Sequence, residues 1–119
     1  MDILRYEERP VTTMEKPKGG EGVLELTAIL RDASLAGSTI DKFNIGKLEV
    51  GHGLGWHRHE GNTETICILS GIADYTGNDG KHYTLHAGDC TFCDNMEYHS
   101  MFAAGDEPLT FIALIVNKV

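Results

Sequence analysis

Apolar residues in this chain gather in short runs that end at glycine, asparagine, aspartate or proline. Several runs are rich in β-branched residues, as in TETICIL at residues 63–69, and none keeps a 3.6-residue apolar period over three helical turns. Such runs predict strands, and the missing period predicts little helix. We expect strands near residues 3–6 and at 23–30, 39–50 (one or two strands), 56–59, 63–69, 72–76, 81–85, 90–93, 98–102 and 109–116.

The segments between these strands carry the residues of tight turns. The sequence GNDG at residues 77–80 separates two of the runs and predicts a β-hairpin. Strands at intervals of about 8–12 residues with turns between them are typical of a β-sandwich or small barrel. The sequence therefore predicts an all-β protein.

A chain of 119 residues fits a single domain. Residues 1–22 are polar and contain two of the three prolines and the run GGEG at 19–22. We expect them to form a loop-rich N-terminal extension that could contribute one strand to a dimer contact. Residues 23–119 then form the domain itself.

The charge of the chain narrows the choice of partners. There are 18 acidic and 10 basic residues, giving a formal charge of −8. Nucleic acids and anionic membrane surfaces attract basic proteins, so neither is expected as a partner. No apolar run is long enough to span a membrane, and the charged N-terminus lacks the apolar core of a signal peptide, so we expect a cytoplasmic protein.

The three cysteines, Cys67, Cys90 and Cys93, are expected to be reduced thiols in that compartment. Cys90 and Cys93 form a C-x-x-C pair, but no second pair completes a zinc site. Residues three apart on a strand also point to opposite faces. We therefore expect small, buried strand residues.

A metal site is the chemistry that the sequence indicates most clearly. His57 and His59 alternate along an expected strand, so both imidazoles point to the same side. Glu64 follows after a turn that brings the chain back beside them, and His99 comes from a distant strand. Three imidazoles and one carboxylate suit a divalent ion such as Mn, Fe, Co, Ni or Zn.

The spacing of these residues resembles the first motif of the cupin superfamily, G-x5-HxH-x3,4-E-x6-G. Gly51, the pair His57 and His59, Glu64 and Gly71 fall into it without a mismatch. Gly80, the Gly-Asp pair at 88–89 and His99 resemble the second motif. The chain departs from that motif in three places: His86 replaces the usual proline, Met96 the usual turn glycine and Ala103 the usual asparagine.

The resemblance covers residues 48–102 and implies the double-stranded β-helix, a jelly-roll-like barrel. It also implies one bound divalent ion, with two coordination positions left open for a ligand. The implied metal ligands are His57, His59, Glu64 and His99. Ile66, Ile68 and Met101 are in phase with them and are expected to line the cavity.

Cupins share a fold and differ in activity, so the resemblance alone leaves several functions open. We favour a metal-dependent enzyme acting on a small oxygen-rich molecule, as a decarboxylase, dioxygenase or isomerase. The alternative is a non-catalytic metal or small-ligand binding or sensor protein, and a metal-free epimerase is a weaker third hypothesis. The chain is most similar to compact oxalate decarboxylase-like cupins, but no arginine is expected inside to hold oxalate.

Arg58, between two inward histidines, is expected to point away from the metal, and Trp56 and Tyr98 also point outward. His52, His82 and His86 are interpreted as exposed. We expect a homodimer, because small barrels leave sheet edges and an apolar outer face for a second copy to cover. The N-terminal segment and residues 23–30 are the expected contact.

Overall fold

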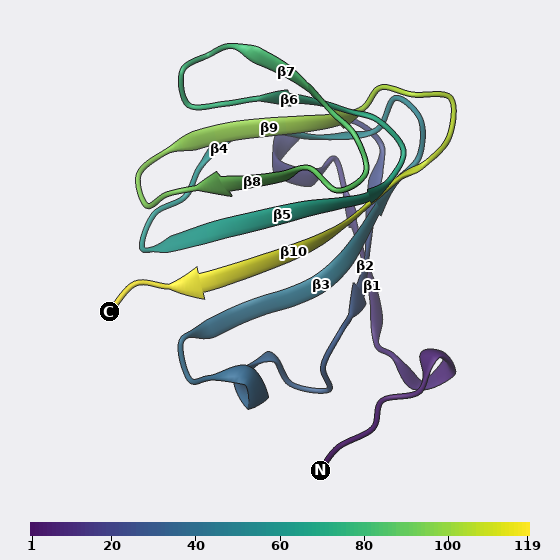
Figure 1. The fold of residues 1–119 in the computed structure, drawn as a ribbon, viewed down its shortest axis with the longest axis vertical. Coiled ribbons are helices and arrows are strands. Elements are labelled where there is room, and N and C mark those ends of the chain that lie inside the picture. The colour runs from purple at the N-terminus through teal and green to yellow at the C-terminus, as the bar shows by residue number, and fades with distance from the viewer.

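The computed structural model describes residues 1–119 and consists of two antiparallel sheets packed face to face (Figure 1). The larger sheet has six strands, in the order β1-β2-β3-β10-β5-β8. Their bounds are β1 Val11–Glu15, β2 Val23–Ala28, β3 Ile40–Leu48, β10 Leu109–Asn117, β5 Asn62–Ser70 and β8 Cys90–Cys93. The smaller sheet, in the order β4-β9-β6-β7, contains β4 Gly53–Arg58, β9 Tyr98–Ala103, β6 Ala73–Thr76 and β7 His82–Leu85. This is the predicted double-stranded β-helix.

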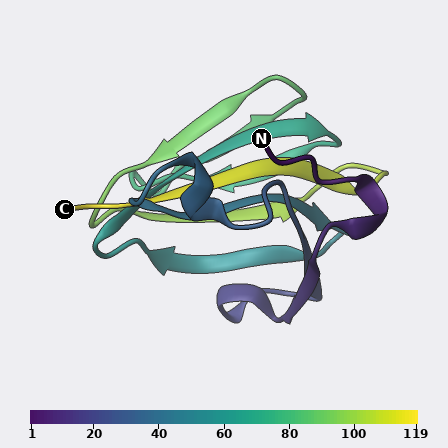
Figure 2. The ribbon, with the colours of Figure 1, turned by 90° about the horizontal axis from the view of Figure 1, so that it is seen from below.

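Three short 3₁₀ helices lie outside the sheets: η1 Tyr6–Glu8, η2 Pro17–Gly19 and η3 Ala33–Ala36. Figure 2 shows η1 beyond one end of the strands, opposite the C-terminus. The structure has no helix with the length and apolar character that a membrane crossing requires.

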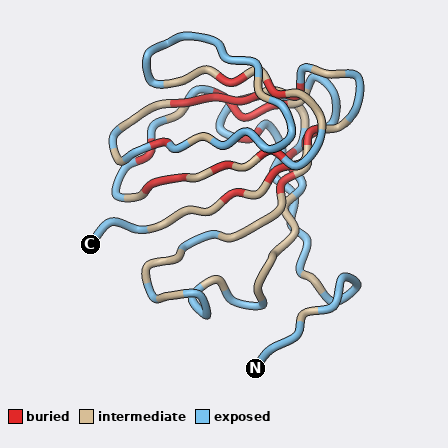
Figure 3. Tube along the Cα trace, in the orientation of Figure 1, coloured by how far each residue is buried: buried red, intermediate tan, exposed pale blue.

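The core lies between the two sheets, where the buried stretches of both meet (Figure 3). On β10, Leu109, Phe111 and Ala113 are buried and the residues between them are only partly so, as strand alternation requires. Phe111 lies across Gly46 of β3, and a Cβ there would come within 2.4 Å of its ring. Gly46 therefore makes room for the largest fully buried side chain of the core.

The predicted strands from residue 23 onward are present, and the hairpin at 77–80 joins β6 to β7. The strand expected near residues 3–6 is wrong, because η1 begins at Tyr6 and β1 begins only at Val11. The sequence of β1, VTTME, has no apolar alternation, and all five of its residues are exposed. Its pairing with β2 places it in the sheet.

The cysteines are free thiols, but they are not all buried as expected. Cys93 is buried, Cys67 is partly buried and Cys90 is exposed. Cys67 and Cys90 face each other across β5 and β8 on the outer side of the sheet. Cys93 points inward, where burial raises the pKa of its thiol to about 12.

Candidate metal centre

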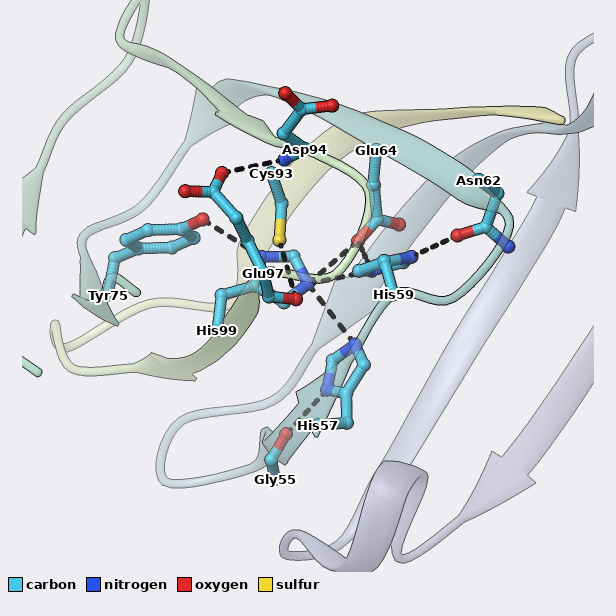
Figure 4. A network of polar contacts seen from close by, with 10 residues as sticks. All are labelled: Gly55, His57, His59, Asn62, Glu64, Tyr75, Cys93, Asp94, Glu97 and His99. Carbon is cyan, nitrogen blue, oxygen red and sulfur yellow. Dashed lines mark hydrogen bonds and ion pairs between the residues drawn. The ribbon is translucent and has the colours of Figure 1, made fainter. Parts of the chain in front are cut away.

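Three neighbouring strands bring four potential metal ligands together between the sheets (Figure 4). His57 lies near the end of β4 and His59 just beyond it, while Glu64 lies on β5 and His99 on β9. His57 is directly opposite His99 in the pairing of β4 with β9. The backbone of His59 continues this pairing, because its N–H donates to the carbonyl of Glu97 over 3.0 Å.

The four ligand atoms lie within 4.8 Å of one another. Nε2 of His99 is 3.0 Å from Nε2 of His59 and 3.1 Å from Nε2 of His57. Oε1 of Glu64 is 3.1 Å from Nε2 of His99 and 3.3 Å from Nε2 of His59. The four predicted residues thus form one cluster, three of them buried and His57 partly buried.

Oxygen atoms outside the cluster orient the three rings. Nδ1 of His57 is 2.7 Å from the carbonyl oxygen of Gly55, and Nδ1 of His59 is 2.7 Å from Oδ1 of Asn62. Both oxygens accept hydrogen bonds, so these Nδ1 atoms carry a proton, and each Nε2 would give its lone pair to a bound ion. Metal-binding histidines are held in this way by their second nitrogen.

Tyr75 of β6 supports the third ring, with its hydroxyl 2.9 Å from Nδ1 of His99. Burial raises the pKa of Tyr75 to about 12, so the phenol is neutral at physiological pH. Asn62 follows His59 by three residues, so its contact with the ring could have been predicted from the sequence. Tyr75 has no such signal, because only the pairing of β6 with β9 brings it near His99.

The protonation states of two ligands suit a cation. Burial lowers the pKa of His57 to about 4, so its ring is neutral at pH 7. Burial acts to raise the pKa of Glu64, but hydrogen bonds with His59 and His99 outweigh it and lower the pKa to about 2. A neutral imidazole and an ionised carboxylate are the forms that bind metal.

His59 differs from these two ligands. Its hydrogen bond with Glu64 raises its pKa, whereas burial and the charge of Lys18 act in the opposite direction. A bound cation would displace the proton shared with Glu64. The donor set of three nitrogens and one carboxylate oxygen, converging without any cationic side chain among them, fits one divalent ion of the Mn to Zn series.

A cavity of about 460 Å³ opens beside this centre. His57, His59 and Glu64 form part of its wall, and its apolar wall consists of Met14, Leu24, Leu26, Leu54, Phe111, Ala113 and Ile115. The expected lining by Ile66, Ile68 and Met101 is wrong. These residues share a face with the ligands but are fully enclosed in the core, because the cavity opens toward β2, β3 and β10 instead.

Arg58 is turned toward the rim of the cavity. Its guanidinium pairs with Glu60 and lies 5.7 Å from the ring centre of Tyr98, which stacks on Trp56. The charge of Arg58 is therefore balanced by a carboxylate.

The other histidines lie apart from the centre. His82 and His86 are exposed, as expected. His52 is partly buried, which corrects the expectation, because its Nδ1 accepts the N–H of Val23 over 3.1 Å and ties β2 to the loop before β4.

The fold and the His₃Glu cluster define a class of protein, the small single-domain cupins. Residues 44–115 match the family model described as Cupin domain, and the chain belongs to this family. It is 32% identical over 114 residues to a Thermotoga maritima protein named oxalate-binding protein, which covers 96% of this chain and 93% of the relative.

Solved structures agree with this assignment. A crystal structure of a predicted oxalate decarboxylase from Thermotoga maritima matches with a TM-score of 0.89 and 31% identity, over 98% of this chain and 99% of that one. KdgF from Halomonas sp. matches with a TM-score of 0.74 and 14% identity, over 98% and 96%, which shows similarity of fold alone.

Proposed function

We propose that the protein binds one divalent metal ion, Mn, Fe, Co, Ni or Zn, and through it a small oxygen-rich anion such as oxalate. The observation that carries the proposal is the convergence of three Nε2 atoms and one carboxylate oxygen within 4.8 Å at the wall of a cavity. The name of the Thermotoga maritima relative supports oxalate as the first ligand to test.

One set of residues would bind the ion, and another set orients the binding residues. His57, His59, Glu64 and His99 would hold the ion, and Gly55, Asn62 and Tyr75 keep the three rings oriented. A six-coordinate ion held by four protein atoms supplies Lewis-acid binding at two further positions. The cavity opens beside the four ligand residues, so it would give a small ligand access to an ion held there.

A metal-dependent enzyme acting on the same class of molecule is the second candidate. Asp41 on the cavity wall favours it, because its carboxylate has no hydrogen-bond or ion-pair partner within the chain and could contact a ligand in the cavity. Glu60, the other carboxylate at the rim, is paired with Arg58. Binding is the first candidate because it requires only the four clustered ligands.

Metal analysis and calorimetry test the proposal. We expect about one ion per chain in natively purified protein and oxalate binding that EDTA abolishes. His59→Ala should reduce metal affinity at least about 100-fold, more than the loss from an outer partner, whereas the exposed control His82→Ala should not. Oxalate binding by metal-free protein would contradict the proposal, and oxalate consumption by the loaded protein would select the enzyme.

The proposal includes a homodimer in the cytoplasm. Two rows of uncharged side chains run across the outer face of the larger sheet. One row contains Val11, Thr27, Ile45, Ile112, Cys67 and Cys90, and the other contains Phe43, Leu114, Thr65 and Phe92. A second copy of the chain would cover these apolar rows, and the free cysteines suit a reducing compartment.

A further inference from the structure

The turn around η2 is fixed to the strand that carries His57. Glu21 and Gly53 exchange two backbone hydrogen bonds, of 3.1 and 2.9 Å, and Pro17 is fully buried beneath the turn. A Cβ on Gly55 would lie 2.3 Å from the carbonyl oxygen of Lys18, and one on Gly20 would lie 2.0 Å from that of Gly53. Only glycine permits this backbone-to-backbone approach.

The same turn holds two lysines in an unfavourable conformation. Lys16 has a φ of 44° and Lys18 a φ of 55°, in the left-handed region that costs a non-glycine residue free energy. Strained residues persist where the surrounding structure fixes them, and they concentrate at ligand sites. Gly19 and Gly20 follow Lys18 directly in the sequence. The strained positions are thus occupied by lysine although glycine stands beside them.

Lys18 lines the metal cavity, whereas Lys16 does not. Three cationic side chains reach the cavity wall: Lys18, Lys42 and Arg58. Arg58 is paired with Glu60, while neither Lys18 nor Lys42 has a carboxylate partner. Of these two lysines, only Lys18 belongs to the turn that is fixed to β4.

We propose that Lys18 is the cationic half of the ligand site, pairing with an anionic oxygen of a ligand whose other oxygens reach the metal centre. The inference rests on the proposed function and deepens it. It names the ligand class as small dianionic chelators, of which oxalate is the simplest, in preference to chelators of lower charge. In a chain of charge −8, a local cation is what draws such an anion to the cavity.

Charge-removing variants test the proposal. In Mn²⁺-loaded protein, Lys18→Met should weaken oxalate binding by about tenfold or more, as expected for loss of one charged hydrogen bond. Lys16→Met is the matched control, because it removes the same charge from the same turn at a similar φ and should change the affinity less than twofold. Neither variant should alter Mn²⁺ affinity, measured separately by titration.

A second variant and a second ligand separate binding from folding. Lys18→Gly removes the charge and the backbone strain together, so it should fold at least as well and lose the same affinity. Lys18→Arg should retain most of it. The loss should be smaller for oxamate, which replaces one carboxylate of oxalate by a neutral amide.

The outcomes distinguish the two proposals. If the wild type binds oxalate through Mn²⁺ and Lys18→Met and Lys18→Gly bind it equally well, the role of Lys18 is refuted and the proposed function stands. Equal losses from Lys16→Met and Lys18→Met would also refute a specific contact. If the wild type itself binds no oxalate, the proposed function fails first.

Discussion

Met96 adopts a left-handed backbone conformation, with a φ of 72°, in the turn between β8 and β9. Its N–H donates to the carbonyl of His59 over 2.6 Å, which ties the turn to the ligand segment. The cupin motif has glycine at this position, and the geometry of the turn is retained here without it. The departure therefore costs conformational energy at Met96 and leaves His99 in place.

Replacing Met96 by glycine should stabilise the protein. The left-handed conformation costs about 1–2 kcal/mol, part of which is offset by the greater freedom of glycine in the unfolded chain, so we expect a gain of about 0.5–1 kcal/mol. Chemical denaturation measures it. Met96→Ala retains the Cβ and should give no gain; an equal gain would show that the exposed side chain, rather than the backbone, is unfavourable.

Tyr75 should affect the metal without touching it. Tyr75→Phe removes the hydroxyl at Nδ1 of His99 and leaves the packing, so we expect metal affinity to fall about tenfold, as for other outer partners. Competition with a chelating dye measures this. The control is Tyr83→Phe, whose hydroxyl binds Asp79 on the exposed side of β7. An unchanged affinity in Tyr75→Phe would mean that packing alone orients His99.

At the scale of single residues, the sequence was most informative where function depends on local spacing. His57 and His59 share a face because strands alternate, and the short turn after them returns Glu64 to their side. Tyr75 reaches His99, and Lys18 the cavity wall, only through pairing between distant segments, which no local pattern records. The cation that we propose for the ligand site therefore lies in the N-terminal extension, a segment for which we expected a dimer contact.

Among the elements, η2 and β4 are held together by close backbone contacts. The two are joined through Gly20 and Gly55, where a side chain would have to displace backbone, and through Gly53, where it would meet the ring of Phe102. The sequence, with glycines at 51, 53 and 55, predicted this strand only from residue 56, yet β4 begins at Gly53. Glycine weakens a strand signal, and here it marks a close backbone contact.

Gly55→Ala should separate η2 from β4. Its Cβ would meet the carbonyl of Lys18 at 2.3 Å, and overpacking of this kind costs about 1–3 kcal/mol. We expect a lower free energy of unfolding in denaturant titrations and weaker oxalate binding. Gly77→Ala is the control, because its nearest neighbour is a movable Asp79 side chain at 3.2 Å. A wild-type stability in Gly55→Ala would show that η2 is not held by this contact.

On the scale of the whole molecule, the two faces of the larger sheet serve different purposes. The inner face supplies the core and the cavity wall, while the outer face carries two uncharged rows of partly buried or exposed side chains. A sheet face of a small domain that is exposed to water is usually polar. Alternation could be read from the sequence for each strand, but the alignment of the rows follows from the registers of five strand pairs, which the sequence does not specify.

If the outer face is a dimer interface, a charge placed on this face should lower the mass of the protein in solution from that of a dimer toward that of one chain. Light scattering coupled to size-exclusion chromatography should give twice the 13.1 kDa mass of the chain for the wild type. Val11→Lys places a charge at the end of one row, on an exposed strand where it costs the fold little, and should shift the mass toward the monomer. Tyr83→Lys is the matched control on the other sheet and should remain dimeric. If the wild type has the mass of one chain at micromolar concentration, the homodimer is excluded. Phe92→Lys places a charge in the second row. If neither Val11→Lys nor Phe92→Lys changes the mass of a wild-type dimer, the interface lies elsewhere.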